Sequence, residues 1–324
     1  MRRFLAVAVL LALALAGAAF AGNGGIAPVE PASPNAERIN DSYLWIAIFT
    51  GAILLVVEGS LIWFIVRYRA GRRRREDDGA QVHGNTNLEL AWTIAPVLIL
   101  VAIGSFIFYK LPGIQDVPDA SAQGGRVEAT VKGYRFYWNF EYDNGVIAVD
   151  RLRAPVGRPM RLLITAPEFE VIHSWWIPSL GGKFDAIPGT VNETWFQPKA
   201  PGIYRGQCAE FCGIQHAVMT ASVEAMPQEE FEAWLDDEAR AQEAGTSELG
   251  EETFRGACAK CHRLGGEGDI GLRLQGNQLL EDERAIEQVV RNGRGEMPPV
   301  GKDWEDRQMA ALTSYLKEEL LGGS

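Results

Sequence analysis

The sequence is poor in cysteine and histidine and has a deficit of positive charge. It holds four cysteines and four histidines among 324 residues, and 31 basic side chains against 42 acidic ones, for a net charge of −11. The charge deficit argues against nucleic acid as a partner, because phosphate binding requires a cationic face. Four cysteines form two disulfides at most, which argues against a fold built on many of them. An acidic surface suits a basic protein partner instead.

The few cysteines and histidines are concentrated. Six of these eight residues lie in two short segments, 208–216 and 258–262. At 324 residues the chain exceeds one typical domain, and we expect roughly two soluble units plus an anchor. The two segments are therefore the first places to look for chemistry.

The first 21 residues have the pattern of a secretory signal peptide. Two arginines precede an apolar run from Phe4 to Ala16, and the small residues that end at Ala21 suit a cleavage site. We predict a signal peptide over residues 1–21. Export places the downstream cysteines in an oxidising compartment, where unprotected thiols tend to form disulfides.

Two apolar runs are long enough to cross a bilayer. They cover residues 43–66 and 90–109, each near the roughly 20 residues that a transmembrane helix needs, and buried core helices are the alternative. Between them lies an arginine cluster at 67–75, which marks a cytoplasmic loop. We predict a transmembrane helical hairpin over residues 42–110 in the cell (inner) membrane, in contact with lipid, with the soluble domains outside.

Short β-rich runs follow the hairpin. Residues 127–132 and 160–165 are examples, and glycine, proline and asparagine separate such runs. Frequent turns between short runs indicate an antiparallel sandwich or barrel, which we place at residues 126–225. An acidic helix and a short linker follow at 226–247.

The β-rich domain carries a motif of soft metal ligands. Cys208, Cys212, His216 and Met219 share one short segment, and His173 lies upstream in a separate run. Thiolates, imidazoles and a thioether select copper over magnesium or calcium. Two cysteines on one loop can bridge a pair of copper ions, with one histidine at each side, and the shared electron then moves with little reorganisation. A disulfide and a Cys2His2 zinc site are the alternatives.

A second motif, Cys258-Ala259-Lys260-Cys261-His262, is the attachment sequence for a c-type haem. Both thiols can add to the porphyrin vinyl groups from one helical turn, and the adjacent histidine then meets the iron. A thioredoxin-like dithiol is the alternative, although it would not require His262.

The sixth ligand to the iron is expected from Met297. Two prolines follow it and keep the segment out of a helix, so the sulfur can be presented to the iron. Methionine opposite histidine raises the reduction potential into the range of an electron carrier. Met309 is the competitor, but its helical spacing with Leu312 and Leu316 favours a place in the core.

Residues from about Ser42 to Leu235 resemble the cytochrome c oxidase subunit II of haem-copper oxidases, and the metal motif is highly specific. The resemblance implies a cupredoxin-like domain with a dinuclear copper centre, CuA, bridged by Cys208 and Cys212. The copper ligands that it implies are His173, Cys208, Glu210 through its main-chain carbonyl, Cys212, His216 and Met219.

The resemblance also implies roles outside the copper ligands. The Glu210 carboxylate is expected to help bind magnesium at the border with subunit I, and Glu89 to lie at the mouth of a proton path. Electrons are expected to enter over Phe136, Tyr137 and Trp138. The family often has tryptophan at the position of Phe136, so this departure argues against direct transfer from a free soluble cytochrome. Surface acids and packed core rings are the ordinary alternatives.

Residues 248–324 resemble a class I cytochrome c domain, with helices expected around 251–259, 283–292 and 303–320. The fold class is thus multidomain: a two-helix transmembrane hairpin, an all-β cupredoxin-like CuA domain and an all-α cytochrome c domain.

Together the two halves resemble the fused subunit of caa3-type oxidases. Electrons are expected to pass from cytochrome c, or from a membrane quinol-cytochrome c oxidoreductase, through haem c and CuA to subunit I. There oxygen is reduced to water and protons are pumped, so this chain is an oxidase subunit only together with subunit I and the other oxidase subunits. The alternatives are the CuA subunit of a nitric oxide reductase and a membrane-anchored copper-binding protein.

Overall fold

A computed structural model describes residues 28–69, 81, 83–119 and 125–321, and the predicted signal peptide at 1–21 lies outside them. The chain divides into two compact units. One holds Arg38–Ile114, and the other holds Gln115–Ser324 together with the chain before Arg38.

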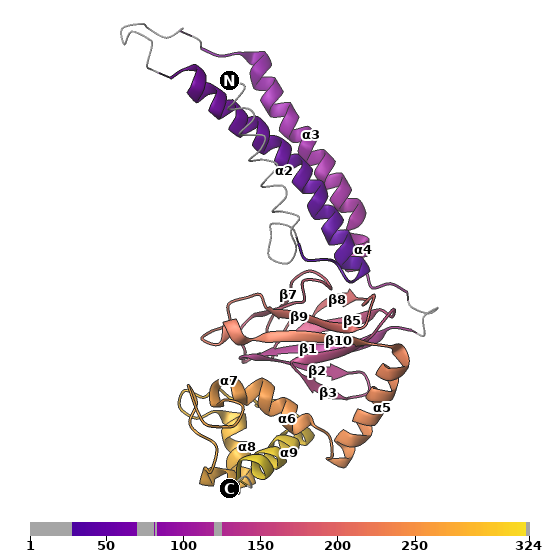
Figure 1. The fold of residues 1–324 in the computed structure, drawn as a ribbon, viewed down its shortest axis with the longest axis vertical. Coiled ribbons are helices and arrows are strands. Elements are labelled where there is room, and N and C mark those ends of the chain that lie inside the picture. Colours follow the sequence, from indigo (N-terminus) through magenta and orange to yellow (C-terminus); the bar gives the residue numbers. More distant parts are fainter. Residues whose placement is uncertain (1–27, 70–80, 82, 120–124, 322–324) are drawn as a thin grey trace. The chain divides into compact units, whose positions relative to one another are not determined.

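Two long helices, α2 (Pro34–Arg67) and α3 (Thr86–Lys110), dominate the first unit and lie side by side (Figure 1). Their most apolar windows have mean hydropathies of 2.1 and 2.3, and none of these windows is buried. Aliphatic and aromatic side chains face outward along both helices, so length and composition suit a membrane crossing. An ion pair of 2.7 Å between Lys110 and Asp41 joins the two helices. The predicted two-helix hairpin is confirmed.

The second unit begins with ten strands in its described part. Their bounds are β1 (Val127–Tyr134), β2 (Tyr137–Tyr142), β3 (Ile147–Val149), β4 (Arg151–Pro155), β5 (Met160–Thr165), β6 (His173–Trp176), β7 (Phe184–Ala186), β8 (Asn192–Phe196), β9 (Gly202–Cys208) and β10 (Thr220–Met226). They form two five-stranded sheets, in the orders β3-β2-β1-β5-β8 and β4-β10-β9-β6-β7. This β-sandwich is the predicted cupredoxin-like domain.

The prediction of a purely antiparallel arrangement is wrong in two pairs. β1 runs parallel to β5, and β4 runs parallel to β10. Turn residues show where a strand ends, but they do not show which strand it will pair with after the chain has crossed to the other sheet. Parallel neighbours therefore could not be seen in the local pattern.

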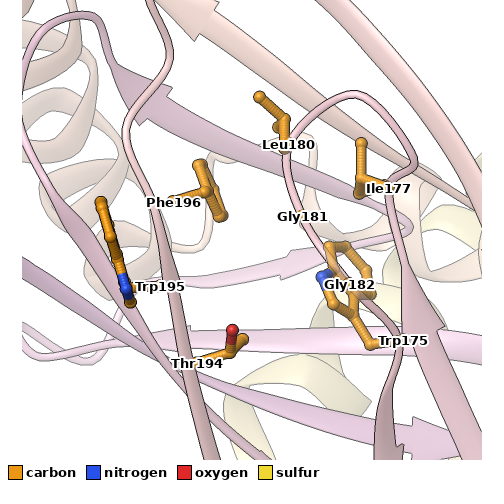
Figure 2. A pocket seen from close by; sticks show the side chains of 8 residues that line it. All are labelled: Trp175, Ile177, Leu180, Gly181, Gly182, Thr194, Trp195 and Phe196. Atoms are coloured by element: carbon orange, nitrogen blue, oxygen red, sulfur yellow. The ribbon is translucent and has the colours of Figure 1, made fainter. Parts of the chain in front are cut away.

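Alternate side chains of the strands fill the sandwich. In β5 every second residue is buried, which is the period expected of a strand with one face on a core. Trp175 meets Trp138 and Phe140 edge to face, with ring centroids 5.3 and 5.4 Å apart. Figure 2 shows a cavity beside Trp175, Leu180 and neighbouring side chains, with a volume of about 10 Å³. This is about the volume that one water needs, so the packing around Trp175 leaves little empty space there.

Helices make up the rest of the second unit. They are α5 (Gln228–Ala244), α6 (Leu249–Thr253), a π-helical turn (Phe254–Cys258), α7 (Ala259–His262), the short 3-10 turn Gln278–Glu281, α8 (Glu283–Asn292), α9 (Asp306–Tyr315) and a closing π-helical segment (Leu316–Leu321). These elements match the three helices expected from the sequence. Gly245 ends α5 with a φ of 69°, a left-handed conformation that glycine adopts without strain.

The helical region has its own hydrophobic core, and strand residues contribute to it. Phe254 and Trp304 pack there together with Tyr134, Tyr137 and Val149 from the first sheet. Met309, Leu312 and Leu316 are buried in this core as predicted. The sandwich and the helical region are therefore joined by shared packing.

Candidate metal centres

The first candidate centre lies where β6 and β9 meet a loop. Trp175 of β6 is paired with Cys208 at the end of β9, so His173 and Cys208 come from adjacent strands. The amide of Ala209 donates to the Ser174 carbonyl at 2.9 Å, which ties the loop to β6. The Cys208 amide donates to the Met219 carbonyl at 2.9 Å and closes the loop. Backbone hydrogen bonds thus fix both ends of the segment that carries most of the predicted ligands.

The predicted ligand atoms converge. The ligand atoms of His173, Cys208 and Cys212 all lie within 4.8 Å of one another. Cys212 Sγ is also 3.6 Å from His216 Nδ1 and 3.7 Å from Met219 Sδ. All five side chains that the motif predicted are therefore assembled at one place.

The main-chain carbonyl of Glu210 belongs to the same cluster. Its oxygen lies 3.2 Å from Cys208 Sγ, while the carboxylate of this residue is on an exposed position. The carbonyl is thus near the sulfurs, as the predicted ligand role requires. None of the described contacts brings the Glu210 carboxylate to a second acid, so its magnesium role stays a prediction.

The surroundings of the cluster fit bound cations. His173 is fully buried, yet neither ring nitrogen has a hydrogen-bond partner among the described residues. A buried polar atom without a partner is costly, and a metal bond removes that cost. The nearest carboxylate oxygen, from Glu170, is 3.9 Å from His173 Nε2. The imidazole is therefore available to a metal held by the two sulfurs, whose ligand atoms lie within 4.8 Å of its own.

The two thiols also lack compensation for a second negative charge. A hydrogen bond from Cys212 lowers the pKa of Cys208, and the same contact raises the pKa of Cys212. One proton is thus shared between two sulfurs, and a pair of thiolates requires positive charge beside it. Neither cysteine forms a disulfide. With two soft sulfurs, two imidazoles and a buried thioether, the donor set suits copper.

Two residues that the sequence did not single out support His173. Gly133 of β1 lies against the imidazole so closely that a Cβ there would be 3.0 Å from the ring. Glu170 is buried and accepts a 2.9 Å bond from Arg135. Nothing in the local sequence marks Gly133, because it meets His173 only through the packing of strands. Glu170, in contrast, lies three residues before His173, and this short spacing is a signal that could have found it.

The aromatic segment expected to receive electrons is largely inside the protein. Tyr137 and Trp138 are fully buried, and Phe136 is half-buried. Trp138 lies edge-on to His173, with ring centroids 6.0 Å apart. The segment therefore connects the neighbourhood of the copper ligands to the helical region, and its part in electron transfer stays a prediction.

The second candidate centre is the Cys258–His262 turn. Cys258 and His262 are buried, and Cys261 is half-buried. His262 Nδ1 lies 2.6 Å from the Leu272 carbonyl, so this nitrogen donates and Nε2 is left for a metal. Gly271 covers the imidazole, since a Cβ there would be 2.6 Å from the ring. His262 would therefore bind an iron through Nε2.

The two cysteines of this turn do not behave as a redox dithiol. Burial raises the pKa of Cys258 to about 12 and also raises the pKa of Cys261. Reactive cysteines of the thioredoxin kind have a lowered pKa instead. The thioredoxin-like alternative is therefore not supported, and attachment of a haem fits the pair.

The proposed sixth ligand lies in a tight turn. Arg294 and Met297 exchange two backbone hydrogen bonds of 3.1 Å. Gly293, with a φ of 74°, lies so close that a Cβ would be 2.5 Å from the Met297 carbonyl oxygen. Met297 packs against the helical core without being fully buried, whereas Met309 is inside it. Of the two methionines, Met297 is the one whose side chain remains near the surface of the core.

Glu89 lies in the helical hairpin unit. Its carboxylate accepts a 3.3 Å hydrogen bond from the backbone N–H of Asn85, while the side-chain oxygen of Asn85 accepts one from the backbone N–H of Leu88. This reciprocal arrangement caps the start of α3. The predicted role in a proton path requires a partner subunit and stays a prediction.

Three family models match the chain. The transmembrane domain of cytochrome c oxidase subunit II matches residues 23–109, its periplasmic domain matches 144–226, and subunit III of cbb3-type cytochrome c oxidase matches 246–316. These matches fall on the hairpin, on the sandwich from β3 to β10 and on the helical region in turn.

Curated relatives agree with these matches. Cytochrome c oxidase subunit 2 of Alkalihalophilus pseudofirmus is 31% identical over 321 residues, which cover 91% of each chain. The subunit 2 of Cereibacter sphaeroides is 32% identical over 265 residues, covering 70% of this chain and 83% of the relative. The periplasmic domain of subunit II of the Bradyrhizobium japonicum cytochrome oxidase is 30% identical, covers 38% of this chain and 97% of that one, and superposes with a TM-score of 0.35.

Proposed function

The chain belongs to the cytochrome c oxidase subunit II family, and we propose that it passes electrons from a haem c in its helical domain to a dinuclear copper centre in its sandwich. It is a two-pass membrane subunit whose soluble domains lie on the outer side. It acts in cytochrome c oxidase together with other subunits, and oxygen is reduced in subunit I.

The observation that carries the copper assignment is the cluster of five side chains. The ligand atoms of His173, Cys208 and Cys212 lie within 4.8 Å of one another, and Cys212 Sγ has His216 and Met219 within 3.7 Å. Cys208, Cys212, His173 and His216 would hold the copper ions, with Met219 and the Glu210 carbonyl as weaker ligands, and the copper would supply one-electron redox chemistry.

The surrounding residues supply rigidity and exclude water. Met219 is fully buried, and Gly133 and Trp138 confine the His173 ring. Ligands that cannot move keep the reorganisation small when the charge of the site changes. In the helical domain we assign Cys258 and Cys261 to the thioether bonds of the haem. There the Leu272 carbonyl orients His262, and we assign Met297 to the opposite face of the iron.

Several parts of the proposal concern partners. Cytochrome c or a quinol-cytochrome c oxidoreductase is the proposed donor, and subunit I is the acceptor. The exposed Glu210 carboxylate is the proposed contact to magnesium at the border with subunit I, and Glu89 is the proposed start of a proton path.

The segment Phe136–Trp138 is proposed to lie on the path between haem and copper. We propose the caa3 arrangement, with domains at 42–110, 126–225 and 248–324 after a signal peptide and with a helix and linker at 226–247.

Metal analysis and spectra of the purified oxidase test this proposal. We expect two copper ions bound to this subunit, a split copper hyperfine pattern with a near-infrared band, and one haem c. The Cys212→Ser variant is expected to lose the copper signals and keep the haem spectrum. A bond between Cys208 and Cys212 in mature protein that holds no copper would overturn the assignment.

The two alternatives find no support in the matches described above, which name oxidase subunits. A nitric oxide reductase would consume nitric oxide in place of oxygen when the purified complex is given a reduced cytochrome. A copper-binding protein would release its copper to a chelator and would show no electronic coupling to the haem. Oxygen uptake therefore identifies an oxidase, nitric oxide uptake identifies a reductase, and uptake of neither gas leaves the copper-binding protein.

A further inference from the structure

Lys260, the residue just before the second cysteine of the haem motif, is held inside a domain interface. Its side chain is 13% exposed. The ammonium donates to the Phe136 carbonyl at 2.8 Å and to Asp150 Oδ2 at 2.5 Å. A buried ammonium is costly unless it is paired and hydrogen-bonded, and both conditions are met here. The contacts are made entirely with the sandwich domain.

Asp150 is itself fixed for this contact. Its backbone has a φ of 57°, a left-handed conformation that costs free energy for a residue other than glycine. Its second carboxylate oxygen accepts from the Trp138 amide at 2.9 Å, and its carbonyl accepts from the Ser222 amide at 3.0 Å. The carboxylate that pairs with Lys260 is thus hydrogen-bonded to β2, the strand that carries Trp138.

The backbone of Lys260 is held by the copper loop. The side-chain amide of Gln215 donates to the Lys260 carbonyl at 3.2 Å. Gln215 directly precedes His216, and Lys260 directly precedes Cys261. One hydrogen bond therefore links the neighbour of a copper ligand to the neighbour of a haem-attachment cysteine.

The Phe136 ring also contacts the copper loop. It lies against Gly213, where a Cβ would be 3.0 Å from the ring. The carbonyl of Phe136 holds the Lys260 ammonium, and its side chain packs on the loop that carries Cys212 and His216. Strand, copper loop and haem motif thus meet at one point.

We propose that Lys260 is a positioning residue, with Gln215 and Asp150 as its partners, that fixes the haem-attachment turn against the copper loop at one separation. This rests on the proposed function. The transfer that it serves moves one electron from the reduced haem iron to the oxidised copper pair, and no covalent bond forms or breaks. The haem is thus a permanently docked donor, and a separate cytochrome is not the immediate donor to the copper.

The test uses the purified oxidase carrying Lys260→Met, which keeps the stem and removes the donors, and Gln215→Leu. Lys317→Met is the matched control, because that lysine pairs with Glu283 within the helical domain and both side chains of the pair are exposed. Pulsed EPR measures the separation of the oxidised copper pair and the oxidised haem. Hydrogen exchange at the Trp138 amide reports opening of the interface, and flash reduction reports the rate of electron redistribution.

We expect one narrow distance in the wild type and in Lys317→Met. Lys260→Met should broaden it, raise the exchange rate of the Trp138 amide by at least about tenfold through loss of a charge-assisted bond, and slow the redistribution. The copper spectrum and the haem content should not change. Unchanged distance and exchange in Lys260→Met and Gln215→Leu would overturn the proposal.

Two outcomes separate this proposal from the one on which it rests. Absence of copper or haem signals in the wild type refutes the electron-transfer function itself. If Lys260→Met fails to acquire haem, Asp150→Asn is measured in its place, because it removes the partner charge without changing the haem motif. A narrow wild-type distance that Asp150→Asn leaves unchanged would then count against the positioning role.

Discussion

The hydroxyl of Tyr137 accepts a 2.7 Å hydrogen bond from the indole N–H of Trp304 and donates one of 2.7 Å to the Val300 carbonyl. Tyr137 belongs to the sandwich, while Trp304 and Val300 follow the turn that carries Met297. Beside them Tyr134 stacks on Tyr137 at 4.9 Å and donates to Asp303 at 2.9 Å. The segment after the proposed iron ligand is therefore hydrogen-bonded to strands β1 and β2 of the sandwich.

Tyr137→Phe should weaken the contact between the two domains. The substitution removes both hydrogen bonds and leaves the buried Trp304 donor without a partner, at a cost of about 1–3 kcal/mol. Denaturant unfolding and proteolysis within the 244–247 linker check this, with faster cleavage expected in the variant. Tyr204→Phe, which loses only a bond to the Ala200 carbonyl at the surface, is the control and should stay close to wild type.

Met219→Leu should keep the copper and change its potential. Leucine fills the buried space at a cost below about 1.5 kcal/mol, so the fold is retained. Loss of the thioether alters the electron density at the copper ions, and redox titration of the copper band should show a shift. An unchanged potential with full copper content would remove Met219 from the set of ligands.

Gly133→Ala should disturb the copper centre without unfolding the sandwich. The added methyl group would be 3.0 Å from the His173 ring and would push the imidazole off its position. The copper hyperfine pattern is expected to change while the haem spectrum stays the same. Gly104→Ala, where a Cβ meets nothing within 4 Å, is the matched control. Identical copper spectra in both variants would contradict the role given to this close approach.

Met297→Leu and Met309→Leu separate the two candidate iron ligands. Loss of a methionine ligand lowers the haem potential and opens the iron to added ligands. We expect both changes in Met297→Leu and neither in Met309→Leu, which only exchanges one core side chain for another of similar volume. Redox titration and binding of carbon monoxide measure them. The reverse result would assign the ligand to Met309.

Glu252 should make the stability of the folded protein fall as the pH rises. Burial raises its pKa above the ordinary value, although Arg153 at 3.0 Å opposes the shift. The folded state then holds this proton more tightly than the unfolded chain, so stability falls as pH rises from the unfolded pKa, roughly 4.3, through the folded one. Thermal unfolding of Glu252→Gln should lack this part of the slope. Parallel wild-type and variant curves between pH 4 and pH 7 would show that the shift is absent.

The sequence could predict the features that depend on neighbouring residues. The long apolar runs of α2 and α3, the Cys208–Met219 segment and the Cys258–His262 turn each act through short spacings, and the structure confirms the hairpin and assembles the first cluster. The helical spacing of Met309 likewise predicted its place in the core.

Most of the features that sequence reasoning missed are long-range. Gly133 meets His173 across 40 residues, and Lys260 meets Asp150 across 110. No local pattern marks such pairs, because each forms only when strands and helices dock. The parallel pairing of β1 with β5 was missed for the same reason. A lysine inside a haem motif is ordinarily expected in water, and nothing beside it in the sequence suggests a buried partner.

Tyr134, Tyr137 and Val149 complete a core whose other members lie more than 100 positions later in the chain. Cleavage of the protein at the linker would therefore leave two fragments, each with a hydrophobic surface exposed to water. The C-terminal piece, prepared alone, would be expected to self-associate or to bind detergent. Mixing it with the N-terminal piece should restore a stoichiometric complex, so the two halves would report on each other by complementation.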